Sequence, residues 1–421
     1  MKTTKTIYLM LLCFFFSITI YGADLFVYPN AQSPDYADIQ SAIDAASDGD
    51  NIYIDTASYI GNININKTLS FYPLHKGGMF TINGAVTLNL INNRTIYIQG
   101  LNGGGVSSSF SGNYTDSASV ILNGCEFSSP VTINDAYSIR SFIYYSTFNS
   151  SVDLDACELI GNTFNGMVNI SANQNSSNIP PYIKVYANDF GNTTAQLYIQ
   201  NAHQANIHIA NNFFYYVTNN SYSIYVAGSS SSQKADKVII ENNIIKNSYT
   251  IYSSNYGDFD IVYSRNIDFL FIRNNYFDIA SYNSNYNNII GIYTSSIGIY
   301  DFQYNFTNYL DNLFSKGSGT IQTIANNTYG TTLSYNTTSQ NSLGNVTSIS
   351  GIDAGSQLPE CRDINNTQND IGTYGGPHSW SNYHNNSSSM AQILDLEIPY
   401  YQIVLPGTQI EFKSKAIHKN E

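Results

Sequence analysis

The segment from residue 256 to 275, YGDFDIVYSRNIDFLFIRNN, gathers side chains suited to acid–base chemistry. Its charged residues are Asp258, Asp260, Arg265, Asp268 and Arg273. Asp258 and Asp260 would face the same side of a strand, because successive side chains alternate between its two faces. An arginine can act as a base, and neighbouring carboxylates can hold a cation that neutralises negative charge on a substrate. The segment therefore indicates a metal-assisted base site, and its alternative is a solvated loop with ordinary ion pairs.

A second candidate site lies in the segment RDINNTQND, residues 362 to 370. Its oxygen-bearing side chains are spaced much as in calcium-binding loops, at Asp363, Asn365, Thr367 and Asp370. The segment lacks the central glycine and the closing glutamate of such loops. It therefore indicates either a structural calcium site or a plain Asx-turn loop that caps the end of the fold.

Tyrosines form a third group of candidates, because three polar stretches concentrate them: residues 211–226, 247–259 and 281–293. Planar rings flanked by asparagine and serine suit the faces and hydroxyl groups of sugars. We expect these stretches to be inter-strand loops that contact a glycan. The alternative is aromatic stacking along the fold without any ligand.

A repeated asparagine indicates the elements that must position these residues. It follows short runs of β-branched or aromatic residues, as in IHIANNFF (207–214) and KVIIENNIIKN (237–247). The predicted positions are Asn162, Asn188, Asn211, Asn242, Asn274 and Asn326. Tyr304 in DFQYNF fills the gap between the last two positions. The resulting intervals of about 22 to 32 residues, without helical periodicity, predict a solenoid of short parallel strands. Stacked asparagines would then form an interior ladder, in which each amide donates to the next carbonyl and holds a bend of the chain.

A short helix is predicted over about residues 36 to 46. Ile39, Ala42, Ile43 and Ala46 follow the spacing of one helical face. Such a helix can cover the first rung, whose open strand edges would otherwise promote aggregation. Gly49 then permits the turn into a strand that begins near residue 51.

Two segments carry a resemblance to known proteins. YADIQSAIDAASDGDNIYI (36–54), followed by SYIGNININKTLSFYP (58–73), resembles the N-terminal segment of right-handed parallel β-helix proteins of the pectin-lyase-like superfamily. The asparagine corners resemble the asparagine ladder of that superfamily, over about residues 24 to 378. GIDAGSQLPECRDINNTQNDIGTYGGP (351–377) is similar to the closing segment of secreted β-helix proteins from Bacteroidetes-type bacteria.

The resemblance implies an all-β, right-handed parallel β-helix, but it leaves the function open, because the superfamily includes enzymes and adhesins. Its lyases act on acidic polysaccharides, with a basic residue and often calcium, and this activity would use the candidate catalytic residues. Its polygalacturonases carry the strings NTD, DD, GHG and RIK, all of which are missing here. His203 and His208 have no acidic pair beside them in the sequence, so this hydrolase class is excluded.

Composition indicates an exported acidic protein. Residues 1 to 22 combine two lysines, an apolar run and a final glycine, which is typical of a signal peptide. The whole chain has a net charge of −13, and removal of this peptide makes it about −15, which disfavours nucleic acid as a partner. Cys125, Cys157 and Cys361 are widely spaced and are expected to be free thiols.

These observations predict a signal peptide (1–22), a β-helix (23–378), a polar linker (379–390) and a short C-terminal β segment (391–421). We expect an exported, surface-associated protein without a later transmembrane segment. It would bind a neutral or weakly charged glycan without cleaving it. The alternatives are a calcium-dependent lyase of an acidic polysaccharide and a purely structural or adhesive solenoid. A base that converges with two or more carboxylates in one groove would favour the lyase.

Overall fold

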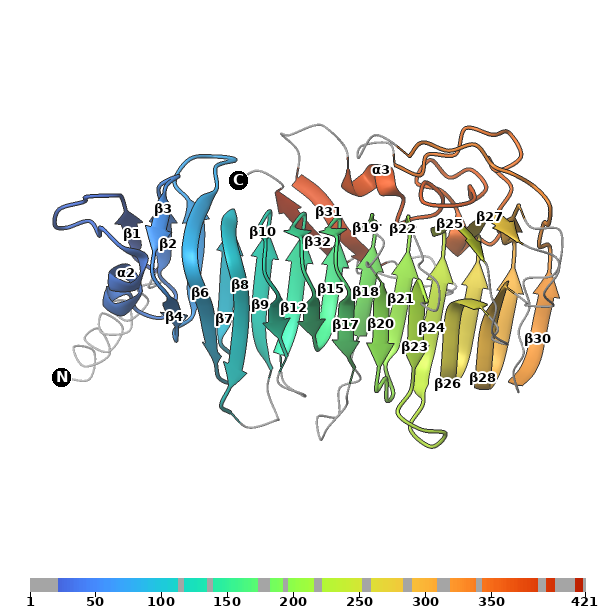
Figure 1. The fold of residues 1–421 in the computed structure, drawn as a ribbon, viewed down its shortest axis with the longest axis horizontal. Helices are drawn as coiled ribbons and strands as arrows, with labels where there is room; N and C mark the ends of the chain where they lie inside the picture. Colours follow the sequence, from blue (N-terminus) through green and yellow to red (C-terminus); the bar gives the residue numbers. More distant parts are fainter. Residues whose placement is uncertain are drawn as a thin grey trace, which may run out of the picture.

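The computed structural model describes most of the chain after residue 21 (Figure 1). The described residues are 22–112, 117–134, 139–172, 182–191, 196–215, 222–251, 259–282, 290–308, 319–337, 343–384, 391–397 and 413–418. Within them, one sheet of 30 parallel strands winds repeatedly around a common axis. The chain is therefore a parallel β-helix, which confirms the predicted fold class. None of the described helices has the length and hydropathy needed to span a membrane.

Each complete turn of the coil passes through three faces, which we call sheets A, B and C. Two long strands, β26 (Phe259–Arg273) and β28 (Ile290–Gln303), bend at Asn266 and Ser296, both with positive φ, and contribute to sheets C and A. The other strands of sheet A are β1 (Asp24–Val27), β2 (Asn51–Ile54), β5 (Leu69–Pro73), β7 (Thr95–Gln99), β9 (Ala118–Asn123), β12 (Ile139–Tyr144), β15 (Ala156–Ile160), β18 (Tyr182–Tyr186), β21 (Asn206–Ala210), β24 (Ala235–Glu241) and β30 (Gly319–Ala325).

Sheets B and C share two further long strands, β6 (Phe80–Leu90) and β8 (Leu101–Phe110). The other strands of sheet B are β3 (Ser58–Ile60), β10 (Glu126–Phe127), β13 (Thr147–Phe148), β16 (Thr163–Phe164), β19 (Asp189–Phe190), β22 (Phe213–Phe214), β25 (Ile244–Ile251), β27 (Tyr276–Tyr282) and β29 (Phe306–Thr307). The other strands of sheet C are β4 (Ile63–Ile65), β11 (Val131–Ile133), β14 (Val152–Leu154), β17 (Val168–Ser171), β20 (Leu197–Gln200) and β23 (Ile224–Ala227).

The core of the coil follows from alternation along the strands. On β21, Ile207 and Ile209 are buried, whereas His208 between them points outward. Because successive strands pair in register, equivalent side chains form columns. One column is a run of stacked rings contributed by sheet B, with centroids 4.5 to 5.3 Å apart: Phe127, Phe148, Phe164, Phe190 and Phe214.

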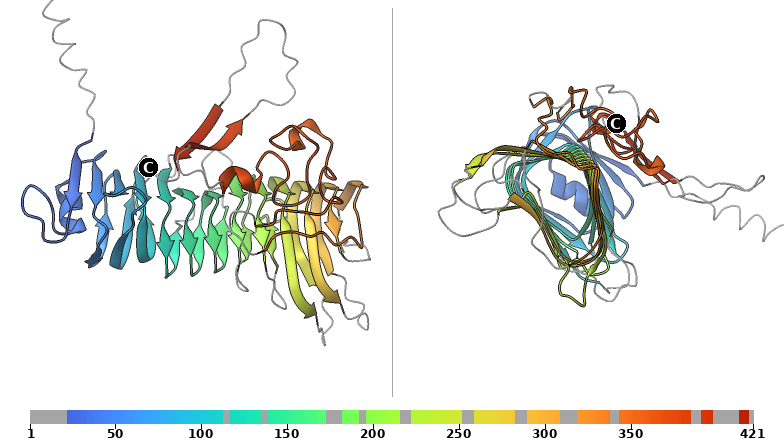
Figure 2. Two further views of the ribbon diagram at one scale, coloured as in Figure 1. Left: turned by 90° about the horizontal axis from the view of Figure 1, so that it is seen from above. Right: turned by 90° about the vertical axis from the view of Figure 1, so that its right-hand side faces the viewer.

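The helix α2 (Ile39–Ala45) lies across the first turns of the coil, as predicted (Figure 2, right). Asp38 caps its N-terminus by accepting a hydrogen bond from the backbone N–H of Ser41. Lys67 Nζ donates to the carbonyl oxygens of Ile43, Asp44 and Ala46, which would otherwise lack partners at the C-terminus. The buried face of α2 is Ile39, Ala42 and Ile43.

The asparagine ladder exists, but it lies one residue later than predicted in the copies with paired asparagines. Each Nδ2 donates to the Oδ1 of the next member at 3.0 or 3.1 Å. The ladder contains Asn162, Asn188, Asn212, Asn243, Asn275, Asn305 and Asn327. Asn162 and Asn188 were therefore placed correctly, whereas Asn211, Asn242, Asn274 and Asn326 do not belong to the column.

The first asparagine of each pair makes the corner itself. Asn211, Asn242, Asn274 and Asn326 have φ between 54° and 58°. Asparagine tolerates this left-handed conformation better than most residues. The same corner is occupied by Gly161, Ala187 and Tyr304 in other turns, also with positive φ. A positive φ turns the chain so that the next residue, rather than this one, points into the coil.

After β30 the chain runs back along the outside of this corner, and we call residues 343–384 the return segment (Figure 1). Asn274 accepts a hydrogen bond from the backbone N–H of Ser356, whereas Asn242 donates to Asn369 and Asp370. Further back, Asn211 donates to the carbonyl oxygens of Thr373 and Gly375. The return segment therefore follows the row of corner asparagines and does not cap the last rung.

A second apolar core lies between the coil and the return segment. The coil contributes Tyr186, Phe213 and Tyr276 among others, and the return segment contributes Ile371, Trp380 and Tyr383. Trp380 and Tyr383 belong to α3 (Trp380–Tyr383), a helical turn that follows the 3-10 helix η2 (Pro359–Cys361). Residues 379–384 are therefore packed, although the sequence predicted a linker from 379. Beyond them, β31 (Ala391–Glu397) and β32 (Lys413–His418) form a separate antiparallel pair.

Candidate functional site

A column of partly exposed tyrosines lies on the outer face of sheet C, in the central part of the coil. Tyr198, Tyr225 and Tyr263 lie in register on β20, β23 and β26 and are partly exposed. Their ring centroids are 4.0 and 4.8 Å apart, with interplanar angles of 14° and 1°. Tyr222 leans on the column, 5.5 Å from Tyr225 and 5.0 Å from Tyr263. We call these four residues the tyrosine column.

Polar and charged groups lie near the tyrosine column. Toward the N-terminus, the same register position holds Asp153 and Asn169, and the amide of Asn169 donates to the carboxylate at 2.8 Å. Beside the last ring of the column, Arg265 follows Tyr263 by two residues along β26 and is exposed. Burial and the neighbouring tyrosines raise the pKa of Tyr225, while the positive charge of Arg265 acts in the opposite direction. The column therefore has a carboxylate farther along its register position and an exposed guanidinium beside its last ring.

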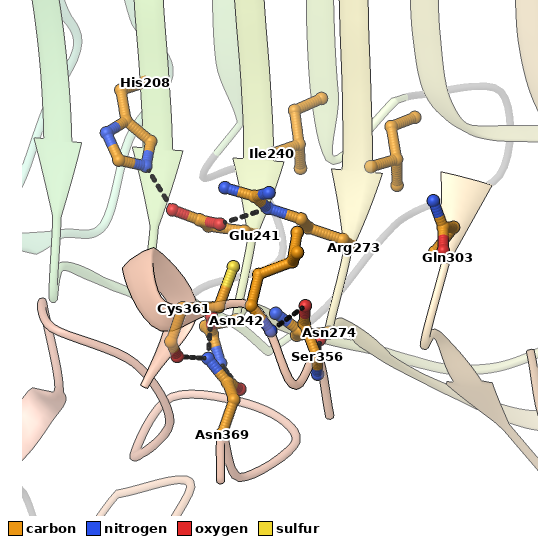
Figure 3. Close-up of polar contacts among 12 residues, drawn as sticks. His208, Ile240, Glu241, Asn242, Arg273, Asn274, Gln303, Ser356, Cys361 and Asn369 are labelled. Carbon is orange, nitrogen blue, oxygen red and sulfur yellow. Dashed lines mark hydrogen bonds and ion pairs between the residues drawn. The ribbon is translucent and has the colours of Figure 1, made fainter. Parts of the chain in front are cut away.

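A second constellation, on the outer face of sheet A, is a buried charge network (Figure 3). Glu241 accepts a hydrogen bond from Arg273 Nε at 2.7 Å and contacts His208 Nε2 at 2.7 Å. His208 Nδ1 lies 2.7 Å from the hydroxyl group of Tyr186. The side chains of Glu241 and Arg273 are only 7% and 16% exposed. A substrate therefore cannot reach this network without displacing the return segment, from which Cys361 points toward it.

Electrostatics hold this network in its charged form. Burial alone would raise the pKa of Glu241, but the charge of Arg273 and the hydrogen bond with His208 outweigh it and keep the pKa well below its usual range. Glu241 in turn raises the pKa of Arg273 against the opposing effect of burial. Burial raises the pKa of the Cys361 thiol to about 12, so this cysteine is not a reactive thiolate. The network is a structural ion pair rather than an acid–base pair that could exchange protons near neutral pH.

The predicted catalytic residues do not converge in the described part of the chain. Arg273 pairs with Glu241, and Asp268 pairs with Lys234 at 3.2 Å. Arg265 lies on the other side of the bend in β26, in sheet C. Asp258 falls outside the described residues, and only the backbone of Asp260 is described, in register with Gly291.

The predicted calcium segment forms a different grouping from the one expected. Asp363 and Asp370 lie with Asp353, and one carboxylate oxygen of each is within 4.8 Å of the others. Asn365 instead accepts hydrogen bonds from the N–H and the hydroxyl group of Thr367, as in an Asx turn. Three carboxylates could supply oxygen ligands to a calcium ion, although Asp363 and Asp370 also accept backbone hydrogen bonds. Calcium binding therefore remains a prediction. Its candidate ligands are now Asp353, Asp363 and Asp370, and Asn365 and Thr367 are no longer among them.

The carboxyl group of Asp363 predicts a dependence of stability on pH. Burial, reinforced by the charge of Asp370, raises its pKa to about 6, above the value of about 3.9 expected in an unfolded chain. The folded protein therefore binds this proton more tightly, so the associated stability is present below about pH 4 and is lost as pH rises through about 6. Asp363→Asn should lose less stability than the wild type over this interval in chemical unfolding experiments. Superimposable pH profiles would contradict this assignment.

The sequence analysis did not predict two groupings, the tyrosine column and the Glu241–Arg273 pair, although Arg273 and the stretch 211–226 were among its candidates. Both groupings have a signal in the repeats. Tyr198 and Tyr263 occur in short triplets, LYI (197–199) and VYS (262–264), which match IYV (224–226) once per turn. Glu241 and Arg273 each directly precede an asparagine pair, so an alignment on the asparagines places opposite charges on adjacent turns. Alignment of whole turns, rather than of asparagines alone, would have found both.

Comparison with protein-family models, with curated proteins and with solved structures finds no match to this chain.

Proposed function

We propose that this chain is an exported, surface-associated β-helix protein that binds a glycan through the tyrosine column and does not cleave it. The observation that carries the proposal is the register of Tyr198, Tyr225 and Tyr263 on three successive turns, all three partly exposed. Aromatic side chains provide large contact areas at a small cost in conformational entropy. Export and surface association are supported by the apolar N-terminal segment and by the resemblance to secreted β-helix proteins of the pectin-lyase-like superfamily.

The stacked geometry indicates how the column would contact a sugar chain. Neighbouring rings cover each other's faces, so the groups left for a ligand are the apolar ring edges and the hydroxyl groups. Successive turns lie about 4.8 Å apart, and the contacts therefore repeat along the axis of the coil. This arrangement favours an extended chain lying along the axis over a single sugar that stacks on one ring.

The lyase alternative has less support, because Arg273, the arginine directly before an asparagine corner, forms a buried ion pair with Glu241. Arg273 and Glu241 leave no room for a substrate carboxylate between them at 2.7 Å. A lyase also needs a base that loses its proton, whereas the pKa of Arg273 is raised further by Glu241.

The test is retention of the purified protein on gels of immobilised neutral and acidic polysaccharides. Tyr225→Ala combined with Tyr263→Ala should lower retention about tenfold, because each aromatic contact is worth about 0.5 to 1.5 kcal/mol. The matched control is Tyr53→Ala combined with Tyr72→Ala. These two tyrosines form a stacked pair on sheet A, and their ring centroids are 5.5 Å apart. Equal retention of wild type and of the sheet C variant would contradict the proposed site.

Incubation with the same polysaccharides, with and without calcium, separates binding from cleavage. We expect no unsaturated product and no new reducing ends. Sustained formation of unsaturated ends would establish the lyase instead.

A further inference from the structure

The charged groups near the tyrosine column differ in sign from one part of the column to another, and this difference bears on the kind of glycan that fits. Arg265 is exposed on the same face of β26 as Tyr263, because side chains two residues apart on a strand point the same way. Asp153 occupies the register position of the column four turns before Tyr263. At the usual strand spacing, the two residues are about 19 Å apart along the axis.

Arg265 also differs from two neighbouring cations, Lys234 and Arg273. Lys234 pairs with Asp268, and Arg273 pairs with Glu241. For Arg265, no carboxylate lies within ion-pair distance among the side chains that the structure describes. An exposed guanidinium beside a row of phenol groups offers both charge and fixed N–H donors to an oxyanion. In a protein with a net charge of −13, this is a local positive charge beside Tyr263.

We propose, on the basis of the proposed glycan-binding function, that Arg265 recognises an isolated sulfate or carboxylate group carried by an otherwise neutral glycan. The neutral part of the chain lies along the tyrosine column toward Asn169 and Asp153, whose oxygen atoms accept hydrogen bonds from sugar hydroxyl groups. A polyuronate fits this surface poorly, because it carries a carboxylate on every sugar and would bring several of them toward Asp153. The site therefore selects a sparsely charged chain over both a neutral chain and a fully charged one.

The experiment compares matched glycans by affinity electrophoresis or retention. The probes are a sulfated galactan and the same galactan after desulfation, a glucuronoxylan and the same xylan with its carboxyl groups reduced, and polygalacturonate. Arg265→Gln should weaken binding of the sulfated galactan or the glucuronoxylan about tenfold, the effect of one charge-assisted hydrogen bond, and leave binding of their neutral counterparts unchanged. Arg265→Lys should retain part of the preference, because the charge stays but the planar fork is lost.

Arg140→Gln is the matched control, since Arg140 is an exposed arginine on β12 in sheet A. It should bind all probes as the wild type does. If Arg265→Gln binds the anionic probes unchanged while loss of Tyr225 and Tyr263 abolishes binding, the role of Arg265 is wrong and the proposed function stands. If the wild type retains none of the probes, the proposed function fails and this inference fails with it. Strongest retention on polygalacturonate would overturn the preference for sparse charge.

Discussion

Replacement of Asn243 by leucine should lower the stability of the coil by about 4 kcal/mol, since several buried polar groups would lose partners at once. Asn243 Oδ1 accepts from both the backbone N–H and the Nδ2 of Asn212, and its own Nδ2 donates to Ile209 O and to Asn275 Oδ1. Asn243 is fully buried, so water cannot replace these bonds. The measurement is the shift of the unfolding midpoint in guanidinium chloride.

The neighbouring residue provides the control that distinguishes the two roles of the asparagine pair. Asn242→Gly preserves the left-handed corner and removes the side-chain hydrogen bonds to Asn369, Asp370 and Gly372 of the return segment. We expect a smaller loss, of about 1 to 2 kcal/mol. A larger loss for Asn242→Gly than for Asn243→Leu would mean that the ladder runs through the first asparagine after all.

The difference between these two residues also shows what the sequence could and could not predict. Short β-branched runs, each followed by asparagine, are a local signal, and they predict the coil and the existence of a ladder. Which member of the pair points inward depends on one backbone torsion at Asn211, Asn242 and Asn274, and residue type alone does not determine it. Asn162 and Asn188 were placed correctly because glycine and alanine make the corner before them, so only one asparagine was available.

The return segment could not be predicted, because its contacts join residues that are far apart in the sequence. Asn211 bonds to Thr373, and His384 Nε2 lies 2.8 Å from Ala187 O. Such contacts have no periodicity that a sequence could reveal. Trp380 and Tyr383 lie among serine and asparagine, and their burial follows only from the apolar outer surface of the coil on which they pack.

The sequence predicted the types of side chain at the candidate sites, but not which individual residues come together. Tyrosine enrichment indicated an aromatic surface, but the column on sheet C depends on the register between β20, β23 and β26, which the sequence fixes only after whole turns are aligned. The segment 256–275 contains the acidic residues and arginines that a catalytic site would need, yet the bend at Asn266 separates Arg265 from Arg273. A cluster in sequence is therefore not a cluster in space when a corner falls inside it.

Replacement of Glu241 by leucine should be the most damaging single change to the buried network, at about 3 to 5 kcal/mol, because it leaves the charge of Arg273 buried without a partner. The double variant, Glu241→Leu with Arg273→Leu, removes both charges together. It should recover most of the lost stability, since replacing a buried ion pair with apolar side chains is often neutral or stabilising. Unfolding midpoints of the two single variants and the double variant give the coupling energy.

The pH dependence of the same variants tests whether Glu241 is ionised in the folded protein. Its pKa is held below the value of about 4.3 expected in the unfolded chain, so its contribution is present above that pH and is lost as pH falls further. The wild type should therefore lose more stability than the double variant between about pH 5 and pH 2. Equal losses would show that Glu241 contributes no ionised pair. If, in addition, the double variant were as unstable as Glu241→Leu, the network would matter through its shape and hydrogen bonds to His208 rather than through charge.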